Sequence, residues 1–578
     1  MTTATMVRRP APADAPARSG AWLWWLLAAG FVAQVALRLW LNRYHLGPVA
    51  NPDETGYLLA ARWLAGGAGA DLSGSTFYQA GYALLLTPIF WLTSDPATAY
   101  RLAVVVGAVA VSGAYPMAYL LLRRLRLRPR TALPVAFAAG LSPSLLVFSG
   151  YALADAILPV LVLGWLVALH DLAARGSARA GTAAGGVAGG AAGGVAGAVA
   201  GAVAGGVAAY AMATHLRGTV IVAVCLLVVA VLFRRLPRAT VIATAASAVA
   251  GAVAGEALNG ALRAALYAGG PRDLSGLLLT RLTSLEGQAW ALSGAAGQLW
   301  YLIAGTWGLA GVGLAGAAAV LARRSAPLPH RVLAGALLAA TLGIAYASSA
   351  ALPDEHRVGN YAYGRYLACV AVAWTLAGLL VLLRGGRRAV AWHALAAAGL
   401  LAVSGGTAAW YAGDRLHRYA FIAFDFPEVI FLSGVRDSLD LVTASLTALV
   451  LLACLAGTAL LATRRTPALV VGGLGLIHLA FAAHLAPAAP PAPGPDWLPA
   501  PGPGRVAVDE RVRWNVWVPL AYRVWWTELE RFRGTPPPGV CTAIVPPGTP
   551  PPPGWAATGH GGDRQGWTSW TGPACRPG

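Results

Sequence analysis

The chain has 578 residues, of which 57% are hydrophobic and 11% are charged, and its formal net charge is +19. Repeated apolar runs of about 20 residues predict a polytopic membrane protein and exclude a soluble globular enzyme. The basic charge comes only from arginine, because the chain has no lysine, and the arginines lie in short clusters between apolar runs. This pattern is typical of the cytoplasmic loops of membrane proteins and argues against a nucleic-acid partner.

We predict an all-α bundle of about 13 membrane-spanning segments. They are 21–41, 98–122, 131–150, 152–171, 183–213, 218–233, 239–261, 298–322, 332–351, 366–383, 389–411, 441–462 and 467–486. On this count the arginine clusters at 123–130, 234–238, 323–331, 384–388 and 464–465 share one side of the membrane, which is the cytoplasmic side. We therefore expect a multi-pass plasma-membrane protein whose first span stays as an anchor.

The predicted organisation has a cytoplasmic tail over 1–20, a transmembrane domain over 21–486 and an extracytoplasmic C-terminal region over 487–578. The outward loops are longer than the cytoplasmic ones and carry nearly all of the acidic residues. These loops are 42–97, 262–297, 352–365 and 412–440. Because binding and catalytic residues concentrate on loops, we expect the function to lie on the outer face.

The first outward loop contains "GPVANPDETGYLLAARWLAGG", in which Asp53 and Glu54 directly follow the first span. A structural interpretation is that Asn51 and Pro52 start a helix and the two carboxylates favour its positive end. A functional interpretation is that they belong to a site, because charges near membrane depth are costly and usually functional.

A low-complexity span carries glycine at every fourth position: 181, 185, 189, 193, 197, 201 and 205. This spacing forms a ridge without side chains, which favours close packing of a neighbouring helix over a flexible hinge.

The C-terminal region begins with a proline-rich spacer, "APAAPPAPGPDWLPAPGPG". The alternation of Val512, Trp514, Val516 and Val518 then predicts a strand. Eight of the 21 tryptophans lie beyond residue 487, where they form the core of a small domain, rest at the membrane interface or stack on sugars. We expect a disulfide between Cys541 and Cys575, since this region faces outward.

The predicted topology brings ionisable groups from several segments to the outer rim of the membrane. Besides Asp53 and Glu54 they are Asp155, His215, Arg217, His356, Arg357, Arg365 and the neighbouring Tyr366. Each residue also has a structural interpretation. Asp155 could cap a helix, His215 could bond the backbone, the arginines could extend to lipid headgroups, and "DEHR" could be a solvated loop. The convergence of these residues at one face of the membrane favours a functional site.

Several motifs resemble the GT-C superfamily of polytopic glycosyltransferases that use polyprenyl-phosphate sugars. The resemblance is to the protein O-mannosyltransferase and lipid A aminoarabinose transferase branches, and it covers roughly residues 20–380. The motifs are "NPDETGYLLAARWL", "YQAGYALLLTP" with Tyr82, Asp155 near the fourth span, "GQLWYLIAGTWGLAGVGL" and "GRYL". The chain departs from the family in having no lysine and in carrying Gln79-Ala80 in the second motif.

The resemblance implies a GT-C-like bundle that moves a sugar from a polyprenyl-phosphate donor to an acceptor hydroxyl on a glycan, lipid or protein. It implies Asp53 as the general base, with Glu54 beside it orienting an acceptor or facing away, and Asp155 orienting the arginines or helping to hold a divalent cation. His215, Arg217, Arg365 and Tyr366 are then the donor-phosphate group, and Tyr82, His356 and Arg357 are further candidates. Whether a metal is used stays open, as does the sugar.

Two other functions are compatible with the sequence. A transporter or flippase of a lipid-linked sugar would use the same basic cleft, but it predicts an internal repeat of broken helices, which the sequence does not display clearly. An assembly protein whose tail binds cell-wall glycan would leave the convergence of charged segments unexplained.

Overall fold

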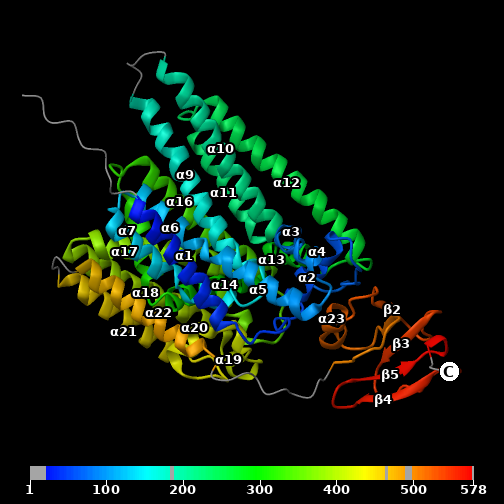
Figure 1. The fold of residues 1–578 in the computed structure, drawn as a ribbon. Helices are drawn as coiled ribbons and strands as arrows, with labels where there is room; N and C mark the ends of the chain where they lie inside the picture. Colours follow the sequence, from blue (N-terminus) through cyan, green and yellow to red (C-terminus); the bar gives the residue numbers. More distant parts are fainter. Residues whose placement is uncertain (1–20, 182–187, 462–465, 488–497, 576–578) are drawn as a thin grey trace, which may run out of the picture.

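The computed structural model describes residues 21–181, 188–461, 466–487 and 498–575. A helical body holds most of the chain, and a small domain with a sheet lies beside one end of it (Figure 1). The expected cytoplasmic tail, the arginines at 464–465 and most of the proline-rich spacer lie outside the described residues.

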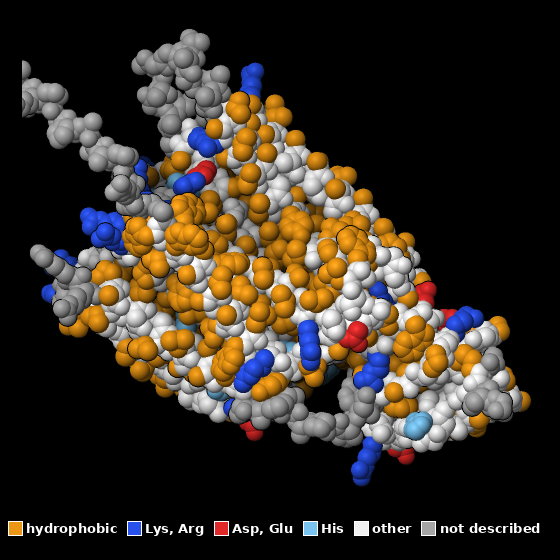
Figure 2. All heavy atoms as spheres, viewed as in Figure 1, with side chains coloured by type: hydrophobic (Ala, Val, Ile, Leu, Met, Phe, Trp, Pro, Cys, Tyr) orange, Lys and Arg blue, Asp and Glu red, His pale blue; other side chains and the backbone are white. Residues whose placement is uncertain are grey.

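Helices occupy the described part of every predicted span. They are α1 (Ala21–Leu41), α5 (Pro96–Ser112) with α6 (Ala114–Arg124), α7 (Pro129–Gly140) with α8 (Pro143–Phe148), α9 (Leu158–Gly181), α10 (Ala188–Thr214), α11 (Arg217–Leu232), α12 (Arg238–Leu266), α14 (Leu285–Gly305) with α15 (Leu309–Ala322), α16 (Leu328–Ala351), α17 (Ala368–Arg384), α18 (Arg387–Ala412), α21 (Leu441–Leu460) and α22 (Thr466–Leu485). Ten helices of the described chain are long and apolar enough to cross a membrane, and the bent pair α14–α15 adds an eleventh. Apolar side chains cover the visible face of the helical body, whereas charged ones gather toward its ends and the C-terminal domain (Figure 2). The chain is a multi-pass membrane protein.

The span formed by α7 and α8 is broken at Leu141 and Ser142, and the freed carbonyls at the end of α7 are bonded by side chains. Gln34 Nε2 donates to the Phe137 carbonyl at 3.0 Å, Arg38 to the Gly140 carbonyl at 2.5 Å, and His478 Nδ1 to the Ala138 carbonyl at 2.8 Å. Because no water satisfies such groups in a bilayer, these polar residues of α1 and α22 make the break possible.

A second break separates α14 from α15, which bend by 112°. Residues 298–322 are therefore not the single straight span that the sequence predicts. Trp307 and Gly308 both have positive φ, and the buried Trp307 ring packs edge-on against Phe431 and Phe481. Gly308 favours this left-handed backbone because it lacks a Cβ.

Part of the glycine ridge lies on α10 and faces α12, so the prediction of close packing is confirmed for Gly197, Gly201 and Gly205. A Cβ at Gly197 would meet Thr240, and one at Gly205 would meet Ser247 and the Ala248 backbone. Gly185 lies outside the described residues.

Gly201→Leu is expected to lower the stability of the protein, because its Cβ would meet the Thr240 carbonyl at 2.7 Å. Overpacking of this kind costs about 1–3 kcal/mol. The matched control is Gly206→Leu, since a Cβ at Gly206 meets nothing within 4 Å. Thermal unfolding in detergent should give a lower Tm for Gly201→Leu only; equal Tm values for the two variants would contradict the packing role.

The C-terminal domain contains a five-stranded sheet in the order β2-β1-β3-β5-β4, so the chain is not wholly α-helical. Its strands are β1 (Arg505–Asp509), β2 (Glu530–Phe532), β3 (Val540–Val545), β4 (Ala556–Gly562) and β5 (Trp567–Thr571). The structure pairs Cys541 with Cys575, whose Cα atoms lie 5.2 Å apart.

The predicted strand around Val512–Val518 is wrong: most of it lies in helix α23 (Trp514–Arg523). Two facts explain this. β1 and β2 are parallel neighbours, and parallel strands require a crossover connection, usually a helix. Val516, Trp517, Leu520 and Ala521 are buried along one face at helical spacing, while Trp514 is 54% exposed.

This domain is anchored on the first outward loop, which holds α2 (Asp53–Leu64), α3 (Ala80–Leu86) and α4 (Ile89–Leu92). The buried Arg62 of α2 donates to the carbonyls of Ala521 and Val524, each at 3.3 Å. Trp517, Trp567 and Trp570 are buried, which confirms the core interpretation for these three.

Candidate active site

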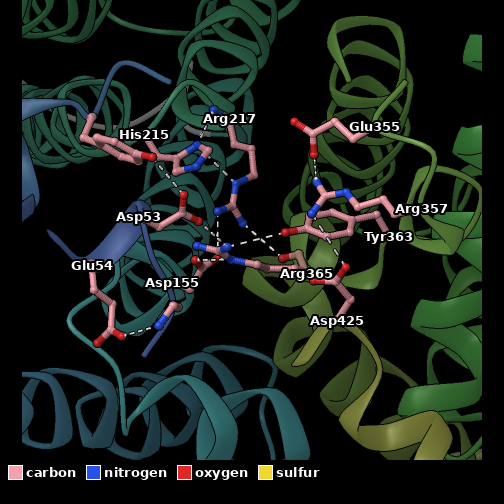
Figure 3. Close-up of polar contacts among 12 residues, drawn as sticks. Asp53, Glu54, Asp155, His215, Arg217, Glu355, Arg357, Tyr363, Arg365 and Asp425 are labelled. Carbon is pink, nitrogen blue, oxygen red and sulfur yellow. Dashed lines mark hydrogen bonds and ion pairs between the residues drawn. The ribbon is translucent and has the colours of Figure 1, made fainter. Parts of the chain in front are cut away.

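The carboxylates of Asp53 and Glu54 point in different directions from the start of α2. Consecutive helical residues are about 100° apart around the axis, so neighbouring side chains reach different surroundings. Asp53 faces a cluster of charged groups, and Glu54 faces away from it (Figure 3). α2 begins at Asp53 without a side-chain cap, so the expected capping by Asn51 does not occur.

Glu54 is fully buried and bonds to backbone and tyrosine groups. One oxygen accepts the N–H groups of Val49 and Ala50 at 2.7 Å each, and the other accepts Tyr100 Oη–H at 2.7 Å and the Ala152 N–H at 2.8 Å. Burial raises the pKa of Glu54, while these four hydrogen bonds act in the opposite direction. Its contacts hold together the first loop, α5 and the segment before α9.

Arg365 connects Asp53 to Asp155 at the centre of the cluster (Figure 3). Its NH1 group lies 2.5 Å from Asp53 Oδ2, and its Nε lies 2.8 Å from Asp155 Oδ2. The other oxygen of Asp155 accepts Arg217 NH2 at 2.6 Å. Two carboxylates and two guanidiniums thus balance each other's charge, which a partly dehydrated site requires.

His215 positions Arg217 in this cluster. Its Nδ1 accepts hydrogen bonds from both the backbone N–H and Nε of Arg217, each at 3.2 Å. Burial and the Arg217 guanidinium lower the pKa of His215 well below its usual value, so the imidazole is neutral. His215 therefore orients a cation and adds no charge of its own.

Irregular backbone beside the membrane-spanning helices supplies these residues. Asp155 lies in a 3₁₀ turn (Ala154–Ala156) before α9, Arg217 follows the break between α10 and α11, and Arg365 lies in a 3₁₀ turn (Gly364–Leu367) before α17. Such backbone is tolerated in a membrane only where protein covers it or a cavity adjoins it.

The two carboxylates differ in access. The Asp155 side chain is 1% exposed, whereas that of Asp53 is 30% exposed. Asp53 Oδ1 also accepts Tyr78 Oη–H at 3.0 Å. Asp53 is therefore the carboxylate that an incoming molecule can reach, and Asp155 is held between its arginines.

A second charged group lies beside the first. Arg357 NH2 is 3.1 Å from Glu355, and its NH1 is 3.8 Å from Asp425 Oδ2. Arg272 also contacts Glu355, at 2.6 Å. Burial raises the pKa of Asp425 to about 6 in spite of the neighbouring Arg357 and Arg365.

The raised pKa of Asp425 predicts a pH dependence of stability. Between the unfolded pKa of 3.8 and the folded value of about 6, the folded protein binds the extra proton, so stability falls as pH rises through this window and then levels off. The loss is on the order of 3 kcal/mol. Thermal unfolding of wild-type and Asp425→Asn proteins between pH 4 and 7.5 should give this slope in the wild type only; parallel curves would contradict it.

A small pocket adjoins both groups. Arg365 and Asp425 both line it, together with Ser142 and Ser144 at the α7–α8 break and Gly305 at the α14–α15 break. The hydroxyls of the two serines and Asp425 Oδ2 have no hydrogen-bond partner in the described chain. Polar atoms of this kind are expected to bind water or a ligand.

The remaining predicted residues divide between the cluster and its surroundings. Arg217 donates to the Tyr366 carbonyl at 3.3 Å and lies over its ring at 5.4 Å. Tyr82 is buried, packs edge-on against Tyr57 and has no hydrogen-bond partner for its hydroxyl among the described residues. His356 is exposed, with its ring 5.2 Å from that of Tyr419, and it lies outside the cluster.

Sequence reasoning missed several residues of the two groups and the pocket, among them Tyr78, Tyr363, Asp425 and Glu428. Tyr78 bonds Asp53, Tyr363 lies 3.4 Å from Arg365 NH1, and Asp425 and Glu428 line the pocket. The signal for the two acids was present in "FDFPEV", where carboxylates interrupt an apolar part of the 412–440 loop.

The carboxylates do not fit a divalent cation as they lie. Asp155 uses both oxygens on arginines, and Asp53 uses its two on Arg365 and Tyr78. Within the described ranges, no group of three or more His, Cys, Asp or Glu residues could hold a metal ion.

No family model and no curated protein matches the sequence. Among solved structures, apo ArnT from Cupriavidus metallidurans is 14% identical with a TM-score of 0.50, and ArnT bound to undecaprenyl phosphate is 13% identical with a TM-score of 0.48. Each comparison covers 97% of this chain and 100% of ArnT. Arabinosyltransferase EmbB from Mycobacterium smegmatis is 14% identical over 83% of this chain and 42% of EmbB, with a TM-score of 0.39. The similarity to apo ArnT over nearly the whole length confirms the expected fold: the chain has the GT-C-like membrane fold of ArnT, with a small C-terminal domain that contains a sheet.

Proposed function

We propose that this protein is a glycosyltransferase that moves a sugar from a polyprenyl-phosphate donor to an acceptor hydroxyl. The observation that carries the proposal is the cluster around Arg365, in which a reachable carboxylate, Asp53, lies beside two buried arginines at membrane depth. ArnT, whose fold the chain shares, binds undecaprenyl phosphate, which supports a donor of this class.

Asp53 acts in this mechanism as the general base. It takes the proton from the acceptor hydroxyl as that oxygen attacks the anomeric carbon, and the bond between this carbon and the donor phosphate oxygen breaks. The donor departs as polyprenyl phosphate with both bonding electrons. Because phosphate is a stable leaving group, the protein's main tasks are to deprotonate the acceptor and to place it in line.

The arginines bind the departing phosphate. Arg365 NH2 has no hydrogen-bond partner among the described residues, so it remains available after Arg365 has bonded Asp53, Asp155 and Tyr363. Charge-assisted bonds from a guanidinium suit the phosphate oxygens. Asp155 and His215 orient the arginines, Tyr366 supports Arg217, and Glu54 fixes the loop that carries Asp53.

The proposed site faces the extracytoplasmic side. The arginine-rich ends of α6, α15 and α17 lie at the opposite end of their spans from Asp53 and Arg365, and arginine-rich loops favour the cytoplasm. This orientation puts the N-terminus in the cytoplasm and the C-terminal domain outside.

The test is an in vitro assay that offers purified protein a panel of polyprenyl-phosphate sugars with mannose, arabinose or an amino sugar. Glycan, lipid and peptide acceptors are supplied together, and products are detected by mass spectrometry. Sugar transfer to a hydroxyl with release of polyprenyl phosphate is expected; absence of transfer across the panel counts against the proposal.

The two broken spans, α7–α8 and α14–α15, favour a second candidate, a transporter of a lipid-linked sugar, because transporter sites are commonly built from interrupted helices. Vesicles containing the protein and a fluorescent polyprenyl-phosphate sugar separate the two functions. A transporter exposes the intact donor on the other leaflet, whereas the transferase consumes it only when an acceptor is present.

A further inference from the structure

A wide cleft opens at the end of the helical body opposite to Asp53. Residues of α15, α16 and α17 form most of its walls. Arg384 lines it and ends α17, whereas Arg365 lies just before the first residue of that helix. The mouth is therefore about 28 Å from the Asp53 cluster, close to the thickness of a bilayer core.

The walls of this cleft are apolar and its mouth is basic. Leucines such as Leu121, Leu333 and Leu380 line the interior. The charged or titratable lining residues are Arg323, His330, Arg384 and His393, and no acidic residue lines the cleft among the described residues.

The two arginines at the mouth lack a carboxylate partner. The Arg323 guanidinium makes no hydrogen bond or ion pair with the described part of the chain. Arg384 donates to the carbonyl of Leu125 at 2.8 Å, which is a neutral acceptor. Asp171, the acid that neighbours this region, is already held by Arg124 through two contacts of 2.5 and 2.9 Å. Positive charge at the mouth is thus left for an anion from outside the chain.

The depth of the cleft indicates the size of its occupant. On α17 the lining extends from Ala373 to Arg384, a rise of about 17 Å. The rise is close to half the thickness of a ~30 Å hydrocarbon core. An acyl chain of one leaflet spans about this half. A free phosphate ion would leave the apolar walls uncovered.

We propose that this cleft binds an anionic phospholipid of the leaflet opposite to Asp53, with its phosphate between Arg323 and Arg384 and one acyl chain against α15 and α17. Basic pockets between membrane helices bind anionic headgroups by this combination of charge and apolar contact. The proposal is independent of the reaction assigned to the Asp53 cluster.

Native mass spectrometry of the full chain in detergent tests the proposal. The probes are 1-palmitoyl-2-oleoyl-phosphatidylglycerol, phosphatidylcholine with the same chains, and inorganic phosphate. We expect one tightly retained phosphatidylglycerol, weaker retention of phosphatidylcholine and no displacement by inorganic phosphate.

The charge contribution is tested with the double variant Arg323→Gln/Arg384→Gln. It should weaken phosphatidylglycerol binding about 25-fold, since each arginine near a membrane surface contributes about fivefold. Arg324→Gln/Arg388→Gln is the matched control, because both residues are exposed at the same end of the protein but do not line the cleft. Equal weakening by the two double variants would overturn the proposal.

The apolar contribution is tested with Ala334→Phe, which fills the cleft from α16, and with Ala318→Phe, at an exposed position of α15 outside it. Only Ala334→Phe should abolish retention of phosphatidylglycerol. Unchanged retention in Ala334→Phe, equal retention of phosphatidylcholine in the wild type, or displacement by inorganic phosphate would each overturn the assignment. The arginine variants keep the test decisive if Ala334→Phe fails to fold.

Discussion

Asp53→Asn is expected to lower the turnover of sugar transfer by about 1,000-fold, because general base catalysis contributes roughly 100- to 10,000-fold. Asparagine has nearly the same shape, and its Oδ1 can still accept the hydrogen bond from Tyr78 Oη, although the bond from Arg365 NH1 is lost. Folding and membrane insertion should be preserved. The measurement is kcat with the polyprenyl-phosphate sugar that the panel assay identifies.

The control for this variant is Asp71→Asn. Asp71 lies in the same outward loop, its side chain is 31% exposed, and it is also paired with an arginine, Arg531, at 3.5 Å. Turnover in Asp71→Asn should match the wild type. Near-normal turnover in Asp53→Asn would remove Asp53 as the base, whatever the control does.

Arg365→Lys is expected to lower kcat/KM by at least about 100-fold although the positive charge is kept. Arg365 bonds Asp53 and Asp155 through different nitrogens, and the single ammonium of lysine does not reproduce this planar arrangement. The substitution therefore releases Asp53 from its place and also weakens phosphate binding.

Arg357→Lys is the matched control for Arg365→Lys. Arg357 also contacts carboxylates and lies 5.3 Å over the Tyr363 ring, but it belongs to the second charged group and does not bond Asp53. Its kcat/KM should fall by no more than about tenfold. Activity and Tm are measured together, because weakening a buried ion pair lowers the stability of the protein as well as its activity. Equal losses in the two lysine variants would contradict the central position of Arg365.

Much of the fold could be predicted because the hydropathy of a segment determines whether it spans the membrane, and the arginines beside it determine its orientation. The apolar runs predicted most of the spans, and the alternation of these spans across the membrane predicted that Asp155, Arg217 and Arg365 lie at the same face as Asp53, with which they form one cluster. The glycine spacing likewise identified a packing surface from one segment alone.

Features that depend on partners distant in the chain could not be predicted in this way. The bend at Trp307 requires the pocket that Phe431 and Phe481 form around its ring. Helix α23 follows from the parallel pairing of β1 with β2, which no local pattern around Trp514 reveals. Glu54 faces away from Asp53 because it bonds Tyr100 and Ala152. These partners are distant in the sequence, so the adjacent positions of the two carboxylates do not reveal their different surroundings.

The four hydrogen bonds accepted by Glu54 have a mechanical consequence for its neighbour. They join residues 49–50, α5 and the turn that precedes Asp155 into one rigid unit, and Asp53 is a single peptide bond away from that junction. These bonds restrain the backbone beneath Asp53, so its carboxylate reorients mainly by rotation of its own side chain. The reacting carboxylate is therefore positioned before the substrate binds, and the entropic cost of aligning the two is small.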